Sequence, residues 1–181
     1  RIAESLAPAV LWIDELEKGF INKQGGGGEA FGYFLTWMQE KQKPVFVVAT
    51  ANEVRMLPPE LLRKGRFDEI FFVDLPNIHE RLQILDIQLR KRGRSPASFD
   101  LTELAEETER FSGAELEQVV ISAMFTAFGA RRELSGDDLI DTAREMIPLA
   151  VTMDDHLKDL REWARPCLLY TSDAADDSAC V

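Results

Sequence analysis

Cysteine and histidine are scarce in this chain of 181 residues. The two cysteines, Cys167 and Cys180, both lie near the C-terminus, so neither a disulfide framework nor a cysteine-based metal site is indicated. The two histidines lie far apart in the sequence, and the chain contains no H-E-x-x-H motif of the kind that binds zinc in metalloproteases. The composition therefore argues against a zinc-dependent protease.

Basic residues and long apolar runs are lacking as well. The chain has 21 Lys and Arg residues against 32 Asp and Glu residues, whereas a general nucleic-acid-binding surface needs a basic footprint. No apolar run approaches the ~20 residues that span a bilayer, so we expect no membrane span. No basic-then-apolar leader opens the chain, so we expect no export signal. These absences leave an acidic globular protein with one domain and room for a small second one.

Both ends of the chain have an unusual character. It opens on RIAESLAP, which looks like the last turns of a helix already under way, so we expect an N-terminal truncation. The last stretch, CLLYTSDAADDSACV, changes composition after Pro166, and its first ten residues resemble the translation of a transposase sequencing adapter. The alternative is a disordered acidic tail. We expect residues 167–181 to be adapter translation rather than native protein.

The first 76 residues have the pattern of a parallel α/β fold. Two apolar runs, 9–13 and 45–49, predict buried strands of a parallel sheet, and residues 69–76 predict a third strand. Between the first two strands, four consecutive glycines predict an irregular surface loop. The loop leads into an amphipathic helix, whose apolar residues recur at helical spacing: Phe31, Phe34, Leu35 and Met38.

From residue 77 the pattern predicts helices only. Four helix starts are indicated by a capping residue with a carboxylate three positions later. These pairs are Asn77 with Glu80, Asp100 with Glu103, Ser112 with Glu115, and Ser135 with Asp138. We expect a small all-helical domain over residues 77–148, followed in 149–166 by a helix from about Met153 to Ala164.

Three polar side chains follow the ends of the first two predicted strands. Asp14 and Glu15 come directly after the first strand, and Asn52 closes the second. Because the carboxyl ends of adjacent parallel strands lie side by side, we expect these side chains to share one site. Phosphoryl transfer needs such a set: an anion for hydrated Mg²⁺, a base for the attacking water and a group that orients it. The alternative is a strand-to-helix turn whose acidic residues favour the helix N-terminus.

Two arginines form a second candidate group. Arg63 and Arg66 flank a glycine in the stretch PELLRKGRFDEIFF, where planar guanidinium groups could be presented to a phosphate. The alternative is a pair of solvated arginines, partly matched by Glu60 and Asp68.

Four motifs, in this order and spacing, resemble the AAA ATPases: VLWIDE, VFVVATAN, LPPELLRKGRFDEIFF and FSGAELEQVV. The resemblance covers nearly all of residues 1–166. It implies an α/β fold that is the C-terminal part of a P-loop NTPase parallel sheet domain over 1–76, followed by a small all-helical AAA lid domain. The phosphate-binding loop G-x-x-x-x-G-K-[ST] occurs nowhere in the chain, which fits truncation because the loop precedes these motifs in the family. The sequence LLRKGRFDE is most similar to a divergent AAA group of cyanobacteria, plastids and other bacteria.

The resemblance also implies residue roles. Asp14 and Glu15 correspond to the Walker-B pair, with Asp14 for Mg²⁺ and Glu15 for activation of the hydrolytic water. Asn52 corresponds to the sensor-1 residue. Arg63 and Arg66 correspond to the arginine fingers, which in this family reach the nucleotide of the neighbouring subunit.

The same resemblance implies roles for lid residues and a function for the whole protein. Gly113 and Ala114 correspond to the lid segment that approaches the bound nucleotide. The cofactors implied are ATP and Mg²⁺, and the partners are further copies of the chain in a ring and an unknown protein client. We expect ATP hydrolysis coupled to protein remodelling, in the cytoplasm or in the plastid stroma of a plastid-bearing source. The alternative is an ATP-dependent assembly switch without significant turnover; retention of Glu15, Asn52 and both arginines favours hydrolysis.

Overall fold

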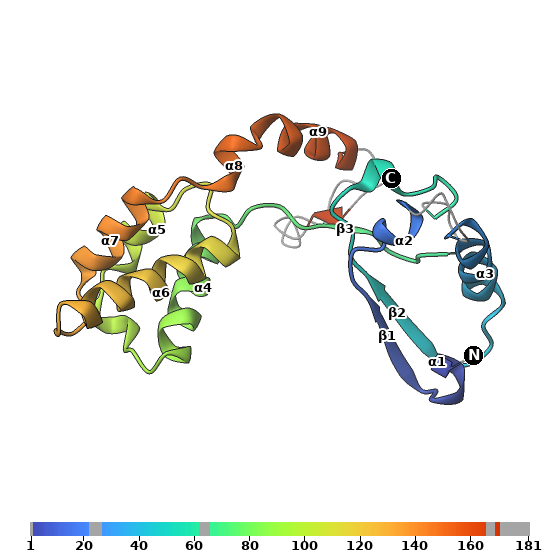
Figure 1. Cartoon of the computed structure of the whole chain (residues 1–181), viewed down its shortest axis with the longest axis horizontal. Helices are drawn as coiled ribbons and strands as arrows, with labels where there is room; N and C mark the ends of the chain where they lie inside the picture. The colour runs from blue at the N-terminus through green and yellow to red at the C-terminus, as the bar shows by residue number, and fades with distance from the viewer. Residues whose placement is uncertain (1, 22–26, 62–65, 166–168, 171–181) are drawn as a thin grey trace. The chain divides into compact units, whose positions relative to one another are not determined.

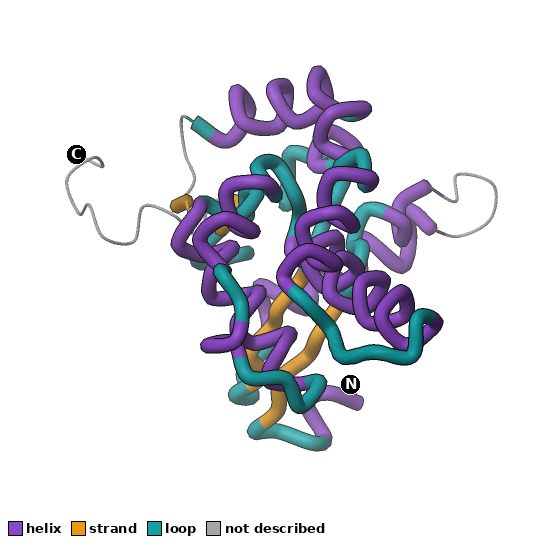
Figure 2. The backbone as a smooth tube through the Cα atoms, turned by 90° about the vertical axis from the view of Figure 1, so that its left-hand side faces the viewer, coloured by secondary structure: helices purple, strands orange, loops and turns teal. Residues whose placement is uncertain are grey.

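The computed structural model describes residues 2–21, 27–61, 66–165 and 169–170. The chain divides into two compact units, Arg1–Ile70 and Phe71–Val181. Figure 1 shows the elements of each unit, and Figure 2 separates their helices from their strands by colour. None of the helices in the described ranges is both long and apolar enough to cross a membrane.

The first unit contains a parallel pair of strands, β1 (Ala9–Ile13) and β2 (Val45–Ala49). Their register runs from Ala9 opposite Val45 to Ile13 opposite Ala49. Both strands were predicted from their apolar runs, and their parallel pairing confirms the predicted fold class. The other elements of this unit are α1 (Ile2–Ser5), α2 (Lys18–Ile21), α3 (Gly27–Glu40) and the 3-10 helix η1 (Val54–Met56).

The helix α3 begins earlier than predicted. Gly27 and Gly28 belong to it, so the prediction of an irregular loop across all four glycines is wrong for these two. Gly25 and Gly26 lie outside the described residues. A glycine costs a helix ~1 kcal/mol relative to alanine. In the first turn of a 14-residue helix, the packing of later residues such as the buried Met38 outweighs that cost.

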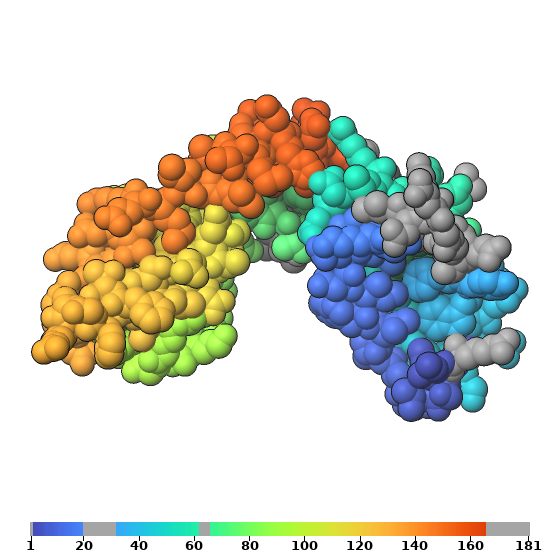
Figure 3. Space-filling model, viewed as in Figure 1, coloured from blue at the N-terminus to red at the C-terminus, as the bar shows by residue number. Residues whose placement is uncertain are grey.

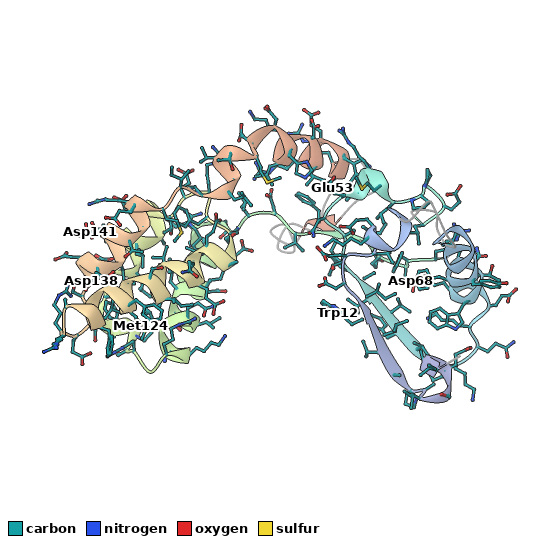
Figure 4. All side chains as sticks on the ribbon, in the orientation of Figure 1. Trp12, Glu53, Asp68, Met124, Asp138 and Asp141 are labelled. Atoms are coloured by element: carbon teal, nitrogen blue, oxygen red, sulfur yellow. The ribbon has the colours of Figure 1, made fainter. Side chains whose placement is uncertain are left out.

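The two faces of the β1–β2 pair differ in burial. Val45 is buried, whereas Val10 and Trp12 of β1 and Phe46 of β2 are exposed. Figure 4 labels Trp12 on this exposed side of β1. The strands are therefore covered on one face only. The prediction of buried strands is wrong for the other face, where these large apolar side chains are exposed in the part of the chain that the structure describes.

The third strand is shorter than predicted. Only β3 (Phe71–Phe72) forms, in parallel with β4 (Leu169–Tyr170), whereas the sequence predicted a strand over residues 69–76. A strand persists only where a neighbour satisfies its backbone groups, and the described part of this neighbour is two residues long. The partner lies in the segment 167–181; the non-native origin of that segment stays a prediction.

The second unit is a helical bundle with a continuous apolar core. Its main helices are α4 (Ile78–Lys91), α5 (Leu101–Glu107), α6 (Gly113–Gly129) and α7 (Gly136–Glu145), with the 3-10 helix η2 (Pro96–Ser98) before α5. Leu85, Leu89, Leu116 and Val119 lie at the centre of the core and are fully buried. The helices α6 and α7, yellow and orange in Figure 3, pack side by side.

All four predicted helix starts are confirmed. Asn77, Ser112 and Ser135 each form a reciprocal capping box with the acidic residue three positions later. Asp100 accepts hydrogen bonds from the backbone N–H groups of Thr102 and Glu103. Each cap satisfies backbone donors that the first helical turn leaves unpaired.

The C-terminal helical segment is bonded to two other parts of the second unit, the loop between α5 and α6 and the segment before α4. It consists of α8 (Leu149–Thr152) and α9 (Asp154–Ala164), the latter as predicted. Arg110 donates to the backbone oxygen of Ala150 at 3.0 Å and pairs with Asp154. Arg161 forms two hydrogen bonds to Asp74, at 2.7 and 2.8 Å.

Asp138 in α7 carries the most heavily bonded carboxylate of the bundle. Its side chain is 6% exposed and accepts two hydrogen bonds from Arg132, each at 2.5 Å. Ser135 adds its backbone N–H and its hydroxyl. The Arg132 guanidinium, helped by Ser135, holds the pKa of Asp138 far below its ordinary value of 3.8.

We expect Asp138→Asn to lower the free energy of unfolding of the second unit by ~1–3 kcal/mol at pH 7, because a buried carboxylate loses its charge-assisted bonds to the half-exposed Arg132. The pKa of this group is depressed in the folded state, so its stabilisation is present above about pH 4 and is lost as the pH falls toward the folded value. Thermal unfolding should therefore separate wild type from variant at pH 7 and bring them together at low pH. Asp141→Asn, which alters an exposed carboxylate of the same helix (Figure 4), serves as control. An equal difference at both pH values would contradict the assignment.

Candidate functional site

The pairing of β1 and β2 continues one step past the strands. The backbone N–H of Thr50 donates to the oxygen of Ile13 at 2.9 Å, and that of Leu16 donates to the oxygen of Thr50 at 2.8 Å. The residues that leave β1 and β2 are therefore bonded to one another. This places Asp14 and Glu15 beside the segment that carries Asn52, as the parallel arrangement predicted.

Thr50 joins the two candidate carboxylate residues. Its hydroxyl donates to Oδ1 of Asp14 at 2.5 Å and accepts the backbone N–H of Glu15 at 3.1 Å. The sequence analysis missed Thr50. The contact depends on the parallel register of the strands, which pairs Ile13 with Ala49 and sets Thr50 opposite Asp14 at the next step.

Glu15 lies at a sharp turn of the backbone. Its φ of 50° is in the left-handed region, which costs a residue with a side chain ~1–2 kcal/mol. The turn brings the Glu15 carboxylate next to two partners: Nζ of Lys18 at 2.5 Å and Nδ2 of Asn52 at 3.4 Å. The hydrogen bond from Lys18 to Glu15 raises the pKa of the Lys18 ammonium. Because the Lys18 side chain is 63% exposed, the ion pair is weak, and Glu15 can exchange it for another partner.

Glu17 is a buried acidic residue at the same edge. It is 3% exposed, and its Oε1 accepts the backbone N–H of Asn52 at 3.1 Å. Its Oε2 is buried and has no hydrogen-bond partner among the described residues. The sequence analysis missed Glu17 too, and no local pattern distinguishes it from the neighbouring acidic residues.

The donor set suits a hard cation. The Asp14 carboxylate offers oxygen atoms, which Mg²⁺ prefers over nitrogen or sulfur, and the Thr50 hydroxyl holds one of them. Within the described ranges, no group of three or more His, Cys, Asp and Glu side chains could hold a metal by itself. A cation at Asp14 would therefore complete its shell with water and phosphate oxygens, which is the usual way in which Mg²⁺ binds.

Arg66 stands apart from this arrangement. Arg63 lies outside the described residues. Arg66 donates through Nη1 to the backbone oxygen of Glu60, and its buried Nε has no partner among the residues that the structure describes. The structure thus gives Arg66 a local contact and does not bring it to the carboxylates.

Gly113 and Ala114 occupy the first turn of α6 in the second unit. The turn is held by Glu115, which accepts the backbone N–H of Leu149 at 2.7 Å and that of Ser112 at 2.8 Å. Burial raises the pKa of Glu115, but these bonds and the Ser112 hydroxyl outweigh it and keep the pKa below its ordinary value. A Cβ on Gly113 would meet only Ile84, at 3.8 Å. The packing of this chain therefore does not itself require glycine at position 113.

Comparison with known families decides the identity of the fold. Residues 1–75 match the family described as "ATPase family associated with various cellular activities (AAA)", and residues 98–156 match the "AAA+ lid domain". The chain belongs to the AAA family.

Curated AAA relatives extend well beyond this chain. It is 49% identical over 170 residues to the "Uncharacterized AAA domain-containing protein ycf46" of Pyropia yezoensis, covering 91% of this chain and 35% of the relative. It is 34% identical over 157 residues to the "Proteasome-activating nucleotidase" of Aeropyrum pernix, covering 81% and 38%. The chain thus spans about a third of the length of these relatives.

A solved AAA structure has the same fold. The "Crystal structure of FIGL-1 AAA domain in complex with ADP" matches with a TM-score of 0.72 at 19% sequence identity, over 92% of this chain and 60% of that one. This likeness confirms the predicted fold: part of an AAA sheet domain followed by a helical lid.

Proposed function

We propose that the full-length protein, the product of the complete reading frame that contains this chain, is an oligomeric AAA ATPase that hydrolyses ATP with Mg²⁺. The observation that carries the proposal is the meeting of Asp14, Glu15 and Asn52 at the carboxyl end of the parallel strands β1 and β2. Two similar proteins support a nucleotide as the ligand: one is named a nucleotidase, and the other binds ADP.

Four residues of this chain would have separate roles in ATP hydrolysis. Asp14 would hold Mg²⁺, which when bound neutralises charge on the phosphate oxygens. Glu15 would accept a proton from the attacking water, and Asn52, whose amide faces Glu15, would orient that water. Thr50 would fix the Asp14 carboxylate through its hydroxyl.

The remaining roles involve other units or copies. Gly113 and Ala114 would approach the nucleotide from the lid. Arg63 and Arg66 would act on the nucleotide of a neighbouring subunit in a ring, where they stabilise charge that develops on the transferred phosphoryl group. We further propose that turnover is coupled to remodelling of a protein client, in the cytoplasm or the plastid stroma.

The test measures turnover and assembly together. We expect the purified full-length protein to release phosphate from ATP at a rate that EDTA abolishes and excess Mg²⁺ restores. We also expect light scattering to show a larger assembly with ATP than without it. ATP-dependent assembly with no phosphate release above that of a Glu15→Gln variant would favour the assembly switch and overturn the hydrolase proposal.

Thr50 offers a separate prediction about the cation. Replacement by valine keeps the shape but removes the hydroxyl that bonds Asp14 and the Glu15 amide. We expect Thr50→Val to raise the Mg²⁺ concentration for half-maximal turnover by about tenfold, as is typical when a residue that supports a metal ligand is lost. Thr50→Ser, which keeps the hydroxyl, should stay near wild type. Mg²⁺ titrations of ATP turnover measure both, and equal curves for valine and wild type would contradict the role.

A further inference from the structure

We propose that Glu17 is a positioning residue that holds Asn52 in place for ATP hydrolysis. The inference rests on the proposed function and adds a residue that the four motif resemblances do not assign. Its basis is one contact: the buried Oε1 of Glu17 accepts the backbone N–H of Asn52 at 3.1 Å.

Stability does not explain a carboxylate at position 17. The side chain is 3% exposed, one oxygen has a single hydrogen bond, and the other is buried with no partner among the described residues. Burying a carboxylate with so few partners is costly, and an apolar residue of similar volume avoids that cost. Among the described residues, the Glu17 side chain makes one hydrogen bond that leucine could not make: it accepts the Asn52 N–H.

That hydrogen bond fixes Asn52 in a segment that belongs to no helix or strand. The sheet pairing ends at Thr50, and η1 begins at Val54, so Asn52 lies in the short stretch between them. Its side-chain amide reaches Glu15 at 3.4 Å, while its backbone amide is bonded to Glu17. The segment after β1 therefore holds Asn52 by both of its amides, and Glu17 supplies the shorter of the two contacts.

Two substitutions separate the acceptor from the charge. Glu17→Gln removes the charge but keeps a carbonyl oxygen that accepts the Asn52 N–H. Glu17→Leu keeps the volume and removes the acceptor, and Glu17→Met is a second such variant if leucine lowers the melting temperature. In the full-length protein we expect leucine or methionine to lower kcat about tenfold or more with KM for ATP within about twofold, because orientation and not binding is lost. Glutamine should stay within about threefold of wild type.

Two further measurements exclude a merely structural role. Hydrogen exchange of the Asn52 amide, followed by mass spectrometry without nucleotide, should be about tenfold faster in the leucine variant and unchanged in the glutamine variant. The double variant Glu17→Leu with Asn52→Ala should be no slower than Asn52→Ala alone, because residues that act as a unit are not additive.

The outcomes are distinct. Unchanged kcat and exchange in the leucine variant, a glutamine variant as impaired as leucine, or losses that multiply in the double variant would each overturn the role of Glu17. In these cases wild-type turnover remains, and the proposed function stands. A wild type that releases no phosphate overturns the proposed function itself, and the role of Glu17 in turnover with it.

Discussion

Glu15→Gln should reduce ATP turnover of the full-length protein by about 10²–10⁴-fold, the usual contribution of a positioned general base. Glutamine keeps the size of the side chain and the contact with Asn52 but does not accept a proton from water at neutral pH. The left-handed φ of Glu15 is as accessible to glutamine as to glutamate, so the fold should be retained. Phosphate release and ATP binding should both be measured on the same preparation. We expect phosphate release to fall and ATP binding to persist.

The matched control is Glu40→Gln, the same chemical change at an exposed position at the end of α3. It should leave turnover at the wild-type rate. Two results would contradict the prediction. Turnover that survives Glu15→Gln would assign the base to another residue, and loss of ATP binding would show that Glu15 acts on affinity rather than on chemistry.

Arg66→Ala should lower turnover by about 10³-fold or more, the contribution typical of an arginine that stabilises a transferred phosphoryl group. Arg66 bonds the Glu60 backbone oxygen through Nη1. That bond uses one of the five N–H donors of the guanidinium group, so it does not prevent a bond from Arg66 to a phosphate. Arg90→Ala removes the same charge at a surface ion pair with Asp86 and should have no effect on turnover.

A mixing experiment shows whether Arg66 acts between subunits. Subunits with Arg66→Ala keep Glu15, and subunits with Glu15→Gln keep Arg66. In a random equimolar ring with head-to-tail contacts, about a quarter of the sites combine an intact Glu15 with an intact Arg66 from the neighbour. We therefore expect mixing of two inactive variants to recover turnover to roughly that fraction. No recovery from assembled mixtures would contradict action in trans.

The elements that the sequence predicted well are those encoded within a few residues. The strands at 9–13 and 45–49 follow from short apolar runs, and both form with those limits. The caps at Asn77, Ser112 and Ser135 follow from an oxygen and a carboxylate three positions apart, and all three are present. Such features are satisfied inside one turn or one strand, so no distant residue has to agree with them.

Predictions that depended on a distant partner were less accurate. The strand expected at 69–76 shrank to Phe71–Phe72, because strand length is set by the neighbour that satisfies its backbone. The helix α3 begins at Gly27 although glycine has a low helix propensity, because packing of the rest of the helix outweighs that propensity. The candidate site shows the same division. Asp14, Glu15 and Asn52 were predicted because they follow the ends of strands, whereas Thr50 and Glu17, which contact them from the other strand segment, were missed.

The sequence by itself determined the parallel strands, the helical lid, the capping residues and the acidic and amide side chains at one edge of the sheet. Only the tertiary structure decided what those side chains contact: Thr50 is bonded to Asp14, and Asn52 is bonded to both Glu15 and Glu17. The physical reason is range. Periodicity and capping act over a few residues, whereas these contacts join positions more than thirty residues apart, and burial and register specify them only once the strands have paired.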